Sequence, residues 1–287
     1  MFEIFQYWQV NLVLAIVLFV VMYPYYRLAA KEFERPSDIP IIFGVIGSVI
    51  FLALMPFFDF HFPTDWRVWA LLLSSNLLYA CQDVLKSKGF KYLDVSVVSI
   101  FSQSSKVFMI LFGIIIFREH LTTLEALGVL FIMAGSALVV FKKNKFHINK
   151  YIWFIIGSSL FFAMAMIIDV GVSGQFNLAF YLLMIYLLPA LFIFIGGRRK
   201  IVDIKKGFLR NKNSRKFTAI AGVASAIGML FYLLALRQGQ VSIVAPLSST
   251  TVLLNVIAGY VFLKERNDLL KRLIAAVLVI IGIFLLV

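Results

Sequence analysis

The 287-residue chain is poor in cysteine, in histidine and in charge. Its single cysteine, Cys81, excludes an intramolecular disulfide and gives no sign of a metal cluster. Only 14% of the residues are charged, well below the soluble average, whereas 62% are apolar and the mean hydropathy is +0.97. A soluble core of this size could not enclose so much apolar surface. We therefore expect most of it to face lipid or neighbouring helices.

The chain also lacks the motifs of common enzymes. It has no G-x-x-x-x-G-K-[ST] loop for ATP, no G-x-S-x-G and no H-E-x-x-H. Its start, MFEIF, carries an acid where a signal peptide is positive, and no cleavage site follows the first apolar run, so we expect no signal peptide to be removed. We predict neither a cofactor, nor a metal, nor enzymatic activity. One alternative stays open, in which Ser102 and Lys106, one helical turn apart, form a Ser–Lys dyad.

Ten apolar runs follow one another along the chain, each near the roughly 20 residues that cross a bilayer as a helix. Runs such as MILFGIIIF do not alternate apolar and polar residues, which excludes barrel strands. The sequence therefore predicts an all-α integral membrane protein with ten transmembrane helices. The predicted spans are residues 6–27, 39–58, 67–87, 95–117, 122–141, 151–171, 176–196, 217–236, 241–263 and 269–287.

One segment of the sequence occurs twice. Residues 95–119, VSVVSIFSQSSKVFMILFGIIIFRE, align without a gap with residues 241–265, VSIVAPLSSTTVLLNVIAGYVFLKE, which lie 146 residues later. Six of the 25 aligned positions are identical, namely Val95, Ser96, Val98, Ser102, Gly113 and Glu119 of the first copy. The spacing is about half of the chain. We therefore predict two repeats, residues 1–146 and 147–287, with five spans each.

Basic residues are distributed unevenly among the loops between the spans. Of the 27 lysines and arginines, 23 belong to every second loop, and only Arg67, Arg118 and Arg237 belong to the others. The positive-inside rule then places the basic loops in the cytoplasm and both termini outside. Because each repeat has an odd number of spans, the second enters the membrane from the opposite side, and the repeat is inverted. The net charge of +13 thus reflects topology and does not indicate nucleic acid.

The longest basic loop, residues 197–216, joins the seventh and eighth spans. Ile201, Ile204, Phe208 and Leu209 recur in it at helical spacing among basic residues. Two interpretations stay open, an amphipathic helix on the anionic inner membrane surface or a solvated basic linker.

Short motifs recur at the same places in both repeats. The first copy reads GFKYLDVS, SIFSQSSK and FREHLT, and the second reads ALRQGQVS, APLSSTT and FLKERND; they occupy residues 89–96, 99–106, 117–122, 235–242, 245–251 and 262–268. With these motifs the chain resembles the drug/metabolite transporter superfamily, of the EamA type, over its whole length. The resemblance implies two five-span repeats and a multi-pass transporter in the plasma membrane (inner membrane) of a prokaryote.

Other features bear on this resemblance. The fifth spans carry the family's small-residue pattern as Gly128 and Gly135 and, more weakly, as Ala276 and Gly282. Pro246 has no counterpart in the first copy. It removes a backbone donor and is expected to break the ninth span, which would expose carbonyl groups to a substrate or ion. Many family members are also thought to keep both termini in the cytoplasm, unlike the orientation inferred from charge.

Lys106 is the sharpest candidate for a functional residue. It lies in the middle of the fourth span, where an ammonium costs about 2.5–3.5 kcal/mol on insertion scales and needs a cavity and a partner. Its counterpart in the second repeat is Val252, so the repeat does not require it. We interpret Lys106 as a fixed positive charge that binds an anionic group or gates a proton. The alternative is a lysine paired with an internal acid for packing, or kept neutral by burial.

Polar and aromatic side chains of other spans complete the predicted site. Asp83 could pair with Lys106 or carry a proton, or could instead belong to the membrane interface. Asp169, at the outer end of the sixth span, is expected to be solvated. Each hydroxyl taken singly is also explained by a bond within its own helix, and Trp8 and Tyr232 by anchoring of span ends. The predicted substrate-binding set is Lys106, Ser102, Gln103, Asn76, Tyr79, Thr251, Asn255, Tyr232 and Trp8.

Two loop acids, Glu119 and Glu265, follow the fourth span of each repeat and fall on opposite faces of the membrane. We expect structural roles, in which each acid caps the helix that follows it or pairs with a neighbouring arginine.

Together these features predict a secondary-active transporter that exports or exchanges a small metabolite by alternating access. Lys106 favours an anionic substrate of the amino-acid or organic-acid kind. A lipid or lipid-headgroup flippase of the same fold is the alternative. The expected partners are the bilayer and the substrate, with a proton or counter-substrate left open, and the sequence gives no oligomeric state.

Overall fold

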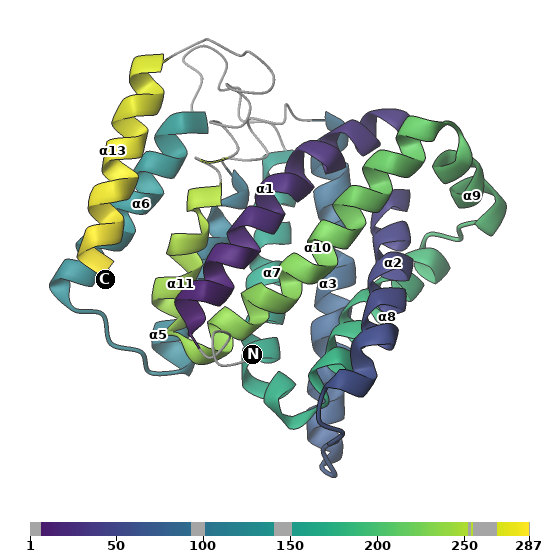
Figure 1. Ribbon diagram of the computed structural model, residues 1–287, viewed down its shortest axis with the longest axis horizontal. Coiled ribbons are helices and arrows are strands. Elements are labelled where there is room, and N and C mark those ends of the chain that lie inside the picture. The colour runs from purple at the N-terminus through teal and green to yellow at the C-terminus, as the bar shows by residue number, and fades with distance from the viewer. Residues whose placement is uncertain (1–6, 93–100, 141–150, 252–253, 255–268, 287) are drawn as a thin grey trace.

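All regular structure in the described part of the chain is helical in the computed structural model, which describes residues 7–92, 101–140, 151–251, 254 and 269–286 (Figure 1). The predicted all-α fold is therefore confirmed for these residues. The α-helices are α1 (Trp8–Glu32), α2 (Ile39–Leu54), α3 (Trp66–Tyr92), α5 (Ser104–Ile116), α6 (Thr123–Val140), α7 (Tyr151–Val172), α8 (Leu178–Gly196), α9 (Ile201–Leu209), α10 (Lys212–Gln238), α11 (Val241–Ser248) and α13 (Leu269–Leu286). Short 3-10 segments are η2 (Pro36–Asp38), η3 (Met55–Phe57) and η4 (Ser173–Gln175).

Six helical segments of the described residues are long and apolar enough to cross a membrane. They coincide with the predicted first, second, third, sixth, seventh and eighth spans. The other four predicted spans contain α5, α6, α11 and α13, which are shorter or border residues outside the described ranges. A multi-pass helical membrane protein is thus confirmed, and the total of ten spans stays a prediction. The six segments are Trp8–Tyr26, Ile39–Phe57, Trp66–Ser87, Tyr151–Gln175, Leu178–Gly196 and Lys212–Gln238.

Each long helix of the first half packs against a helix of the second half. α2 packs on α8, α5 on α11 and α6 on α13, which joins equivalent spans of the two halves. α1 packs on α10 and α3 on α7, so the first and third spans exchange partners. If each helix is replaced by its equivalent in the other half, the same helix pairs result. The equivalent helices α6 and α13 also run in opposite directions along the bundle (Figure 1).

Glycines allow close approach in two of these pairs. A Cβ atom at Gly44 of α2 would lie 2.6 Å from the Tyr186 carbonyl oxygen of α8. A Cβ atom at Gly282 of α13 would lie 2.7 Å from the Gly128 carbonyl oxygen of α6. Lipid supplies little hydrophobic drive between helices, so such close packing is what holds them together. The small-residue pattern of the fifth spans therefore marks the contact of α6 with α13.

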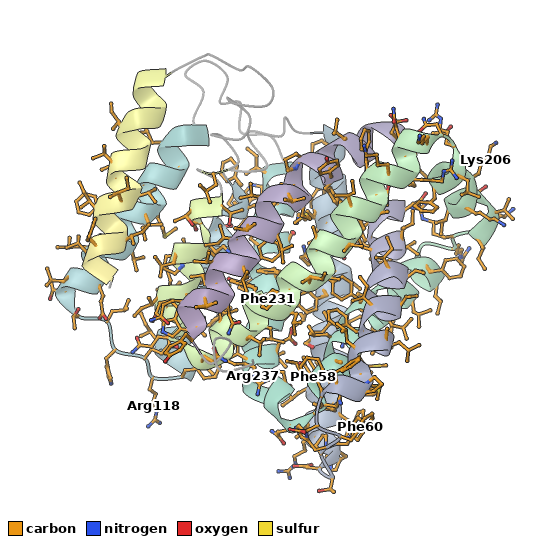
Figure 2. The ribbon with its side chains drawn as sticks, viewed as in Figure 1. Phe58, Phe60, Arg118, Lys206, Phe231 and Arg237 are labelled. Atoms are coloured by element: carbon orange, nitrogen blue, oxygen red, sulfur yellow. The ribbon has the colours of Figure 1, made fainter. Side chains whose placement is uncertain are left out.

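The two ends of the bundle differ in their number of basic residues, because the loop that contains α9, residues 197–216, alone holds nine lysines and arginines. Lys206, on α9, lies at one end, and Phe60, Arg118 and Arg237 lie at the other (Figure 2). We call the end with α9 the basic face and the other end the opposite face. The separation agrees with the alternation of basic loops along the sequence. Which face lies in the cytoplasm stays a prediction.

Aromatic rings close the bundle at the opposite face. Trp69 of α3 lies 4.9 Å from Phe176 and 6.0 Å from Phe180 between ring centroids, and Phe62 lies 5.0 Å from Phe180. The rings join the α2–α3 connection of the first half to the α7–α8 connection of the second. We call Phe62, Trp69, Phe176 and Phe180 the aromatic latch.

Hydrogen bonds hold the same two connections together. The Asn177 backbone N–H donates to the His61 carbonyl at 2.8 Å, and its side-chain amide donates to the Phe58 carbonyl at 2.9 Å. Asn177 is also the N-cap of α8, because its Oδ1 accepts from the Phe180 N–H at 2.9 Å. One buried side chain therefore starts a helix and fixes a contact between the halves.

Polar groups close the bundle at the basic face. Arg199, before α9, forms an ion pair with Asp38 at 3.3 Å and donates a hydrogen bond to the Ser37 hydroxyl. Asn211 donates to the Glu32 carboxylate at 2.7 Å. Burial raises the pKa of the Asp38 carboxyl, and the Arg199 and Arg35 guanidinium groups partly oppose that shift. We call this set the polar latch; it consists of Glu32, Ser37, Asp38, Arg199, Arg210 and Asn211.

The apolar spacing in the long basic loop produces helix α9. Ile204 and Phe208 pack against the end of α1 around Ala29 and Phe33, while Ile201 stays 69% exposed. A basic helix with an exposed apolar residue favours the amphipathic surface helix over the solvated linker.

Candidate functional site

The regular α-helical pattern of the fourth helix of each half is interrupted for one residue at the same place in the repeat. The residues are Gln103, just before α5, and Ser249, just after α11, and they lie 146 residues apart. The backbone of both residues stays in the right-handed helical region, so the helix tightens there without breaking. In the second copy the Ser249 N–H donates to the Pro246 carbonyl at 2.9 Å. Pro246 lies three residues before this turn, whereas its missing N–H affects the preceding turn of the helix, so the proline does not explain the interruption at Ser249. The first copy is interrupted without a proline.

Hydroxyl groups beside the interruptions make matching bonds in the two copies. Ser105 donates to the Ser102 carbonyl at 2.8 Å, and its counterpart Thr251 donates to the Ser248 carbonyl at 2.7 Å. These bonds within one helix satisfy the hydroxyls without a substrate. Gln103 differs, because its buried Oε1 has no partner among the described residues.

Lys106 reaches from α5 to the second half of the chain. Its ammonium donates to the Tyr232 hydroxyl of α10 at 3.3 Å and lies 5.1 Å from the centre of that ring. It also lies 5.9 Å from the centre of the Phe162 ring of α7. Tyr232 is only 2% exposed. Two residues of the predicted set, one from each half, therefore meet, and the ammonium bonds to Tyr232 rather than forming the Ser102 dyad.

No carboxylate neutralises Lys106 within the part of the chain that the structure describes. The one ion pair shorter than 4.0 Å among those residues joins Arg199 to Asp38, so Asp83 does not pair with Lys106 there. Each aromatic contact offsets about 0.5–2 kcal/mol, against about 2.5–3.5 kcal/mol for placing the charge in the membrane. An ammonium has three N–H donors and the Tyr232 hydroxyl accepts one, so the ammonium keeps bonding capacity for water or an anionic ligand.

Five helices contribute side chains around the Lys106–Tyr232 contact. Lys106 of α5 also lies over Phe162 of α7, and the Ser248 hydroxyl of α11 lies 3.5 Å from the hydroxyl of Tyr232 on α10. The Tyr232 ring meets Phe19 of α1 edge-on at a centroid distance of 5.9 Å. Helices of both halves thus surround the Lys106–Tyr232 contact. Any movement of one half relative to the other changes the distances between these side chains.

Other members of the predicted set lie elsewhere. Trp8 packs against Gly239, about 10 Å along α10 from Tyr232 at the helical rise per residue. Asn76 is buried and donates to the Leu72 carbonyl of its own helix at 2.7 Å. The predicted residues Asn255 and Glu265, and Val252, the counterpart of Lys106, lie outside the described residues.

Glu119 stabilises a helix of the other half. Its carboxylate oxygens accept hydrogen bonds from the N–H groups of Val241 at 2.6 Å and Ser242 at 2.8 Å, in the first turn of α11. The expectation that it caps the following helix is wrong, because α6 begins with its own capping box between Thr122 and Glu125. A carboxylate suits the positive end of the α11 dipole. Glu119 therefore links the halves near the opposite face.

Asp169 is buried, which contradicts the expectation that it is solvated. Its exposed fraction on α7 is 0%. Tyr79 donates to its Oδ2 at 2.6 Å and Tyr181 donates to its Oδ1 at 2.7 Å. The helical segment that is long and apolar enough to cross a membrane runs from Tyr151 to Gln175, so Asp169 lies within it. Tyr79, predicted to contact substrate, belongs to this cluster.

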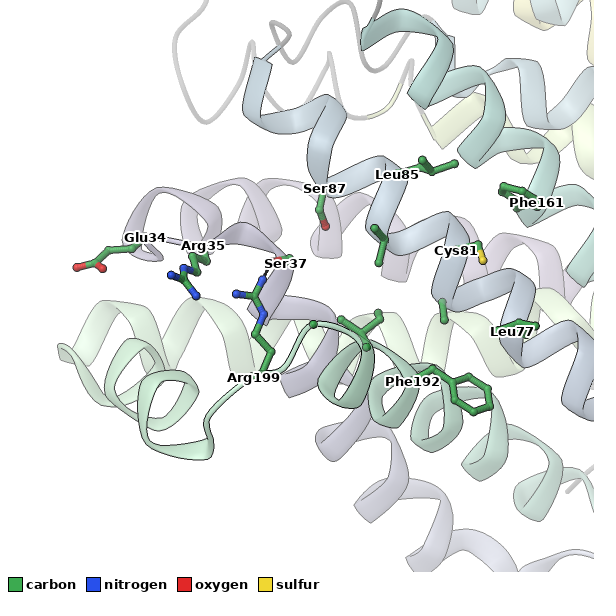
Figure 3. A pocket seen from close by; sticks show the side chains of 15 residues that line it. Glu34, Arg35, Ser37, Leu77, Cys81, Leu85, Ser87, Phe161, Phe192 and Arg199 are labelled. Atoms are coloured by element: carbon green, nitrogen blue, oxygen red, sulfur yellow. Dashed lines mark hydrogen bonds between the residues drawn. The ribbon is translucent and has the colours of Figure 1, made fainter.

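A groove of about 690 Å³ runs along α3 and α8 toward the basic face (Figure 3). Leu77, Val84 and Phe192 form its apolar part, and Leu77 is 54% exposed, so the groove opens on the flank of the bundle. Arg35, Arg199 and the acid Glu34 lie at its polar end, and Arg199 is paired there with Asp38. Lys106 does not line it.

Sequence reasoning missed three residues of these sites. Phe162 and Tyr181 lie inside apolar runs, where nothing distinguishes them from lipid-facing residues. Asn177 carried a usable signal, because an asparagine just before an apolar run is a common N-cap. Within the described residues no three histidine, cysteine or acidic side chains gather closely enough to hold a metal ion.

These observations define a class. The protein is a multi-pass helical membrane protein whose two halves meet at the charged residue Lys106. A polar site between two halves of the chain is typical of transporters. The model of the EamA-like transporter family matches residues 6–141 and again residues 149–287. The chain therefore belongs to the EamA-like transporter family, and the resemblance noted in the sequence is confirmed. Membership indicates a membrane transporter of small molecules, a class whose members are generally not enzymes.

Two further comparisons place the chain among known proteins. An uncharacterized protein of Methanocaldococcus jannaschii is 43% identical over 86 residues, which make up 30% of this chain and 62% of that protein. The match thus spans less than two thirds of the relative. A protein of known crystal structure superposes with a TM-score of 0.76 at 13% identity, over 96% of this chain and 94% of the other. At this identity the likeness shows the fold alone.

Proposed function

We propose that the protein is a secondary-active transporter that moves a small anionic metabolite by alternating access between two inverted repeats, residues 1–146 and 147–287, with five transmembrane helices each. Helix pairing that survives exchange of the halves, and the opposite directions of α6 and α13, support the inverted relation. In transporters built from inverted repeats, one repeat rotates against the other around a binding site that lies between them. The observation that carries the proposal is the contact of Lys106 with Tyr232 across the halves.

Lys106 binds the anionic group of the substrate. It lies in the first turn of α5, immediately after the interruption at Gln103. Its ammonium is a positive charge inside the bundle and favours a negative group nearby. A carboxylate or phosphate that arrives there displaces no ion pair of the described residues.

The two latches close the ends of this site in turn. Each latch joins a connection of one half to a connection of the other. Rotation of the halves about the central site therefore separates one set of contacts while it compresses the other. The aromatic latch controls access from the opposite face, and the polar latch controls access from the basic face.

Counterflow in proteoliposomes tests the role of Lys106. A screen of radiolabelled amino acids, organic acids, nucleosides and phosphorylated metabolites first identifies the substrate. Lys106→Ala then removes a charge-assisted bond of about 1.5–3 kcal/mol, which lowers counterflow by about tenfold or more. Lys206→Ala, on exposed α9, is the matched control and leaves counterflow unchanged. Wild-type counterflow in a well-folded Lys106→Ala protein contradicts the proposal.

The basic face lies in the cytoplasm of a prokaryote, and both termini lie outside. The distribution of 23 of the 27 basic residues supports this orientation. In a Cys81→Ser background, a cysteine at Phe60 is then labelled by an impermeant thiol reagent on intact cells, and a cysteine at Lys206 is not. The reverse labelling overturns the orientation.

A lipid flippase is the second candidate function, because the groove along α3 and α8 opens on the flank and ends at two arginines. Val84→Trp fills this groove. For a flippase, the substitution slows translocation of a fluorescent anionic phospholipid in vesicles. For a metabolite transporter, it leaves counterflow intact and lipid translocation stays at the level of protein-free vesicles.

A further inference from the structure

The buried cluster around Asp169 has no role in anion binding at Lys106. Both carboxyl oxygens accept from a tyrosine hydroxyl, Oδ2 from Tyr79 of α3 and Oδ1 from Tyr181 of α8. Ser75 adds a third hydroxyl beside the carboxyl group. The cluster is fully enclosed, because the exposed fractions of Asp169, Ser75 and Tyr181 are all 0%.

No cation compensates a negative charge on Asp169 within the described residues. The titratable side chains that α3 and α8 present to it are Tyr79 and Tyr181. On α5, the Lys106 ammonium lies over the Phe162 ring, 5.9 Å from its centre. Arg237 of α10 approaches Gly174, and His61 of the α2–α3 connection bonds to the carbonyl of the same glycine, beyond the end of α7. None of these groups forms an ion pair with Asp169.

Two opposite effects act on the protonation of Asp169. Burial without a cation among the described residues favours the neutral carboxyl group, whereas the two tyrosine O–H donors favour the carboxylate. Because these effects oppose each other, a change in the surroundings of the carboxyl group alters whether a proton is bound.

The neighbouring atoms accommodate both forms without movement of a helix. In the charged form the Tyr79 O–H donates to Asp169. In the neutral form the Asp169 O–H donates to the Tyr79 oxygen, and the Tyr79 O–H turns to the Met166 sulfur, which lies 2.9 Å from it. Methionine sulfur is a weak acceptor, and it lets the network exchange one proton through rotation of one hydroxyl.

The cluster is connected to the Lys106 contact through one ring. Phe162, Met166 and Asp169 lie on one face of α7. The Phe162 ring centre lies 6.2 Å from that of Tyr79 and 5.9 Å from the Lys106 ammonium. A change in the charge of Asp169 therefore changes the electrostatic potential at the Lys106 ammonium, because the intervening region has a low dielectric constant.

We propose that Asp169 is the proton-binding residue of this transporter and that its protonation favours anion binding at Lys106, which makes the protein a proton–anion symporter. Neutral Asp169 removes a negative charge that opposes the incoming anion. By linkage, a bound anion favours protonation of Asp169 by the same factor. The aromatic latch adjoins the cluster, since Phe176 lies 5.3 Å from the Tyr181 ring, so protons reach it from the opposite face when that latch opens. The symport rests on the proposed transport function, whereas proton binding does not.

Infrared difference spectroscopy of the purified full-length protein in lipid nanodiscs tests proton binding without a substrate. As the pH is raised, the wild-type protein loses the C=O band of a protonated carboxyl group. Asp169→Asn lacks this transition, and Asp83→Asn, the matched acid of α3, keeps it. Tyr79→Phe and Tyr181→Phe, which leave the carboxyl group in place, move the transition to higher pH, because the carboxylate then has one donor fewer. A transition that is unchanged in Asp169→Asn or in both tyrosine variants overturns the proposal.

Transport in vesicles tests the coupling. With the substrate found by the screen, an inward proton gradient drives accumulation by the wild-type protein, and Asp169→Asn abolishes that accumulation while it retains counterflow at equal pH. Gradient-driven accumulation by Asp169→Asn contradicts the symport. Failure of the wild-type protein in both assays, with the infrared transition intact, refutes the transport function and leaves proton binding by Asp169 standing.

Discussion

The two ends of the bundle are closed by different chemistry. At the opposite face four rings pack at centroid distances between 4.9 and 6.4 Å. At the basic face one ion pair and hydrogen bonds from Arg199, Arg210 and Asn211 hold the halves together. Ring packing depends on burial and hardly on salt, whereas exposed and half-buried charges respond to salt and pH. Salt and acid pH therefore weaken the contacts between the halves at the basic face, and they leave those at the opposite face largely unchanged.

The largest effect is expected from removing the central ring of the aromatic latch. Trp69→Ala deletes contacts to three rings and costs the closed state about 3 kcal/mol. A cysteine at buried Ser173, beneath the latch, then reacts with a thiol reagent at least about tenfold faster. Trp66→Ala, whose side chain is 72% exposed, is the control and changes little. If the cysteine at Ser173 reacts equally fast in the Trp69→Ala and Trp66→Ala variants, the four rings do not control access at the opposite face.

A smaller effect is expected at the basic face. Asp38→Ala leaves the partly buried Arg199 without its partner and weakens the polar latch by about 1–3 kcal/mol. A double-mutant cycle with Arg199→Ala measures the coupling through thermal unfolding, and added salt or acid pH shrinks it. Arg198→Ala, one residue away and exposed, is the control. Coupling that stays constant from low to high salt contradicts the distinction between the two latches.

The smallest effect concerns the polar link near the aromatic latch. Glu119→Ala removes the cap of α11 and lowers the stability by about 1 kcal/mol. Glu119→Gln keeps one acceptor and loses less, and exposed Glu34→Ala loses nothing measurable. Thermal unfolding in detergent ranks the three variants. If Glu34→Ala is the least stable of the three variants, Glu119 does not cap α11.

The sequence predicted the helical segments well because apolar length is a local property. Lys106 and Tyr232 could be proposed singly for the same reason, since a charge or a hydroxyl in an apolar run is conspicuous. Their contact joins α5 to α10, and no pattern within one copy of the repeat reveals a partner in the other.

The errors have the same physical origin. The position of Asp169 at the outer end of the sixth span predicts a solvated carboxyl group, but tyrosines of other helices enclose it. Chain order predicts that Glu119 caps the following helix, although the helix end that it contacts belongs to the other half. The interruption at Gln103 has no proline to announce it, and becomes visible only beside its counterpart at Ser249.

The central claim is that the two latches open in alternation, and distances between spin labels test it most directly. One pair, at exposed Phe60 and Gln175, spans the aromatic latch, and the other, at exposed Glu34 and Lys206, spans the polar latch. We predict that Trp69→Ala lengthens the first distance and leaves the second short, that Asp38→Ala does the reverse, and that saturating substrate shifts wild-type molecules between these two states. Molecules in which both distances are long at once, as in an open pore, contradict alternating access.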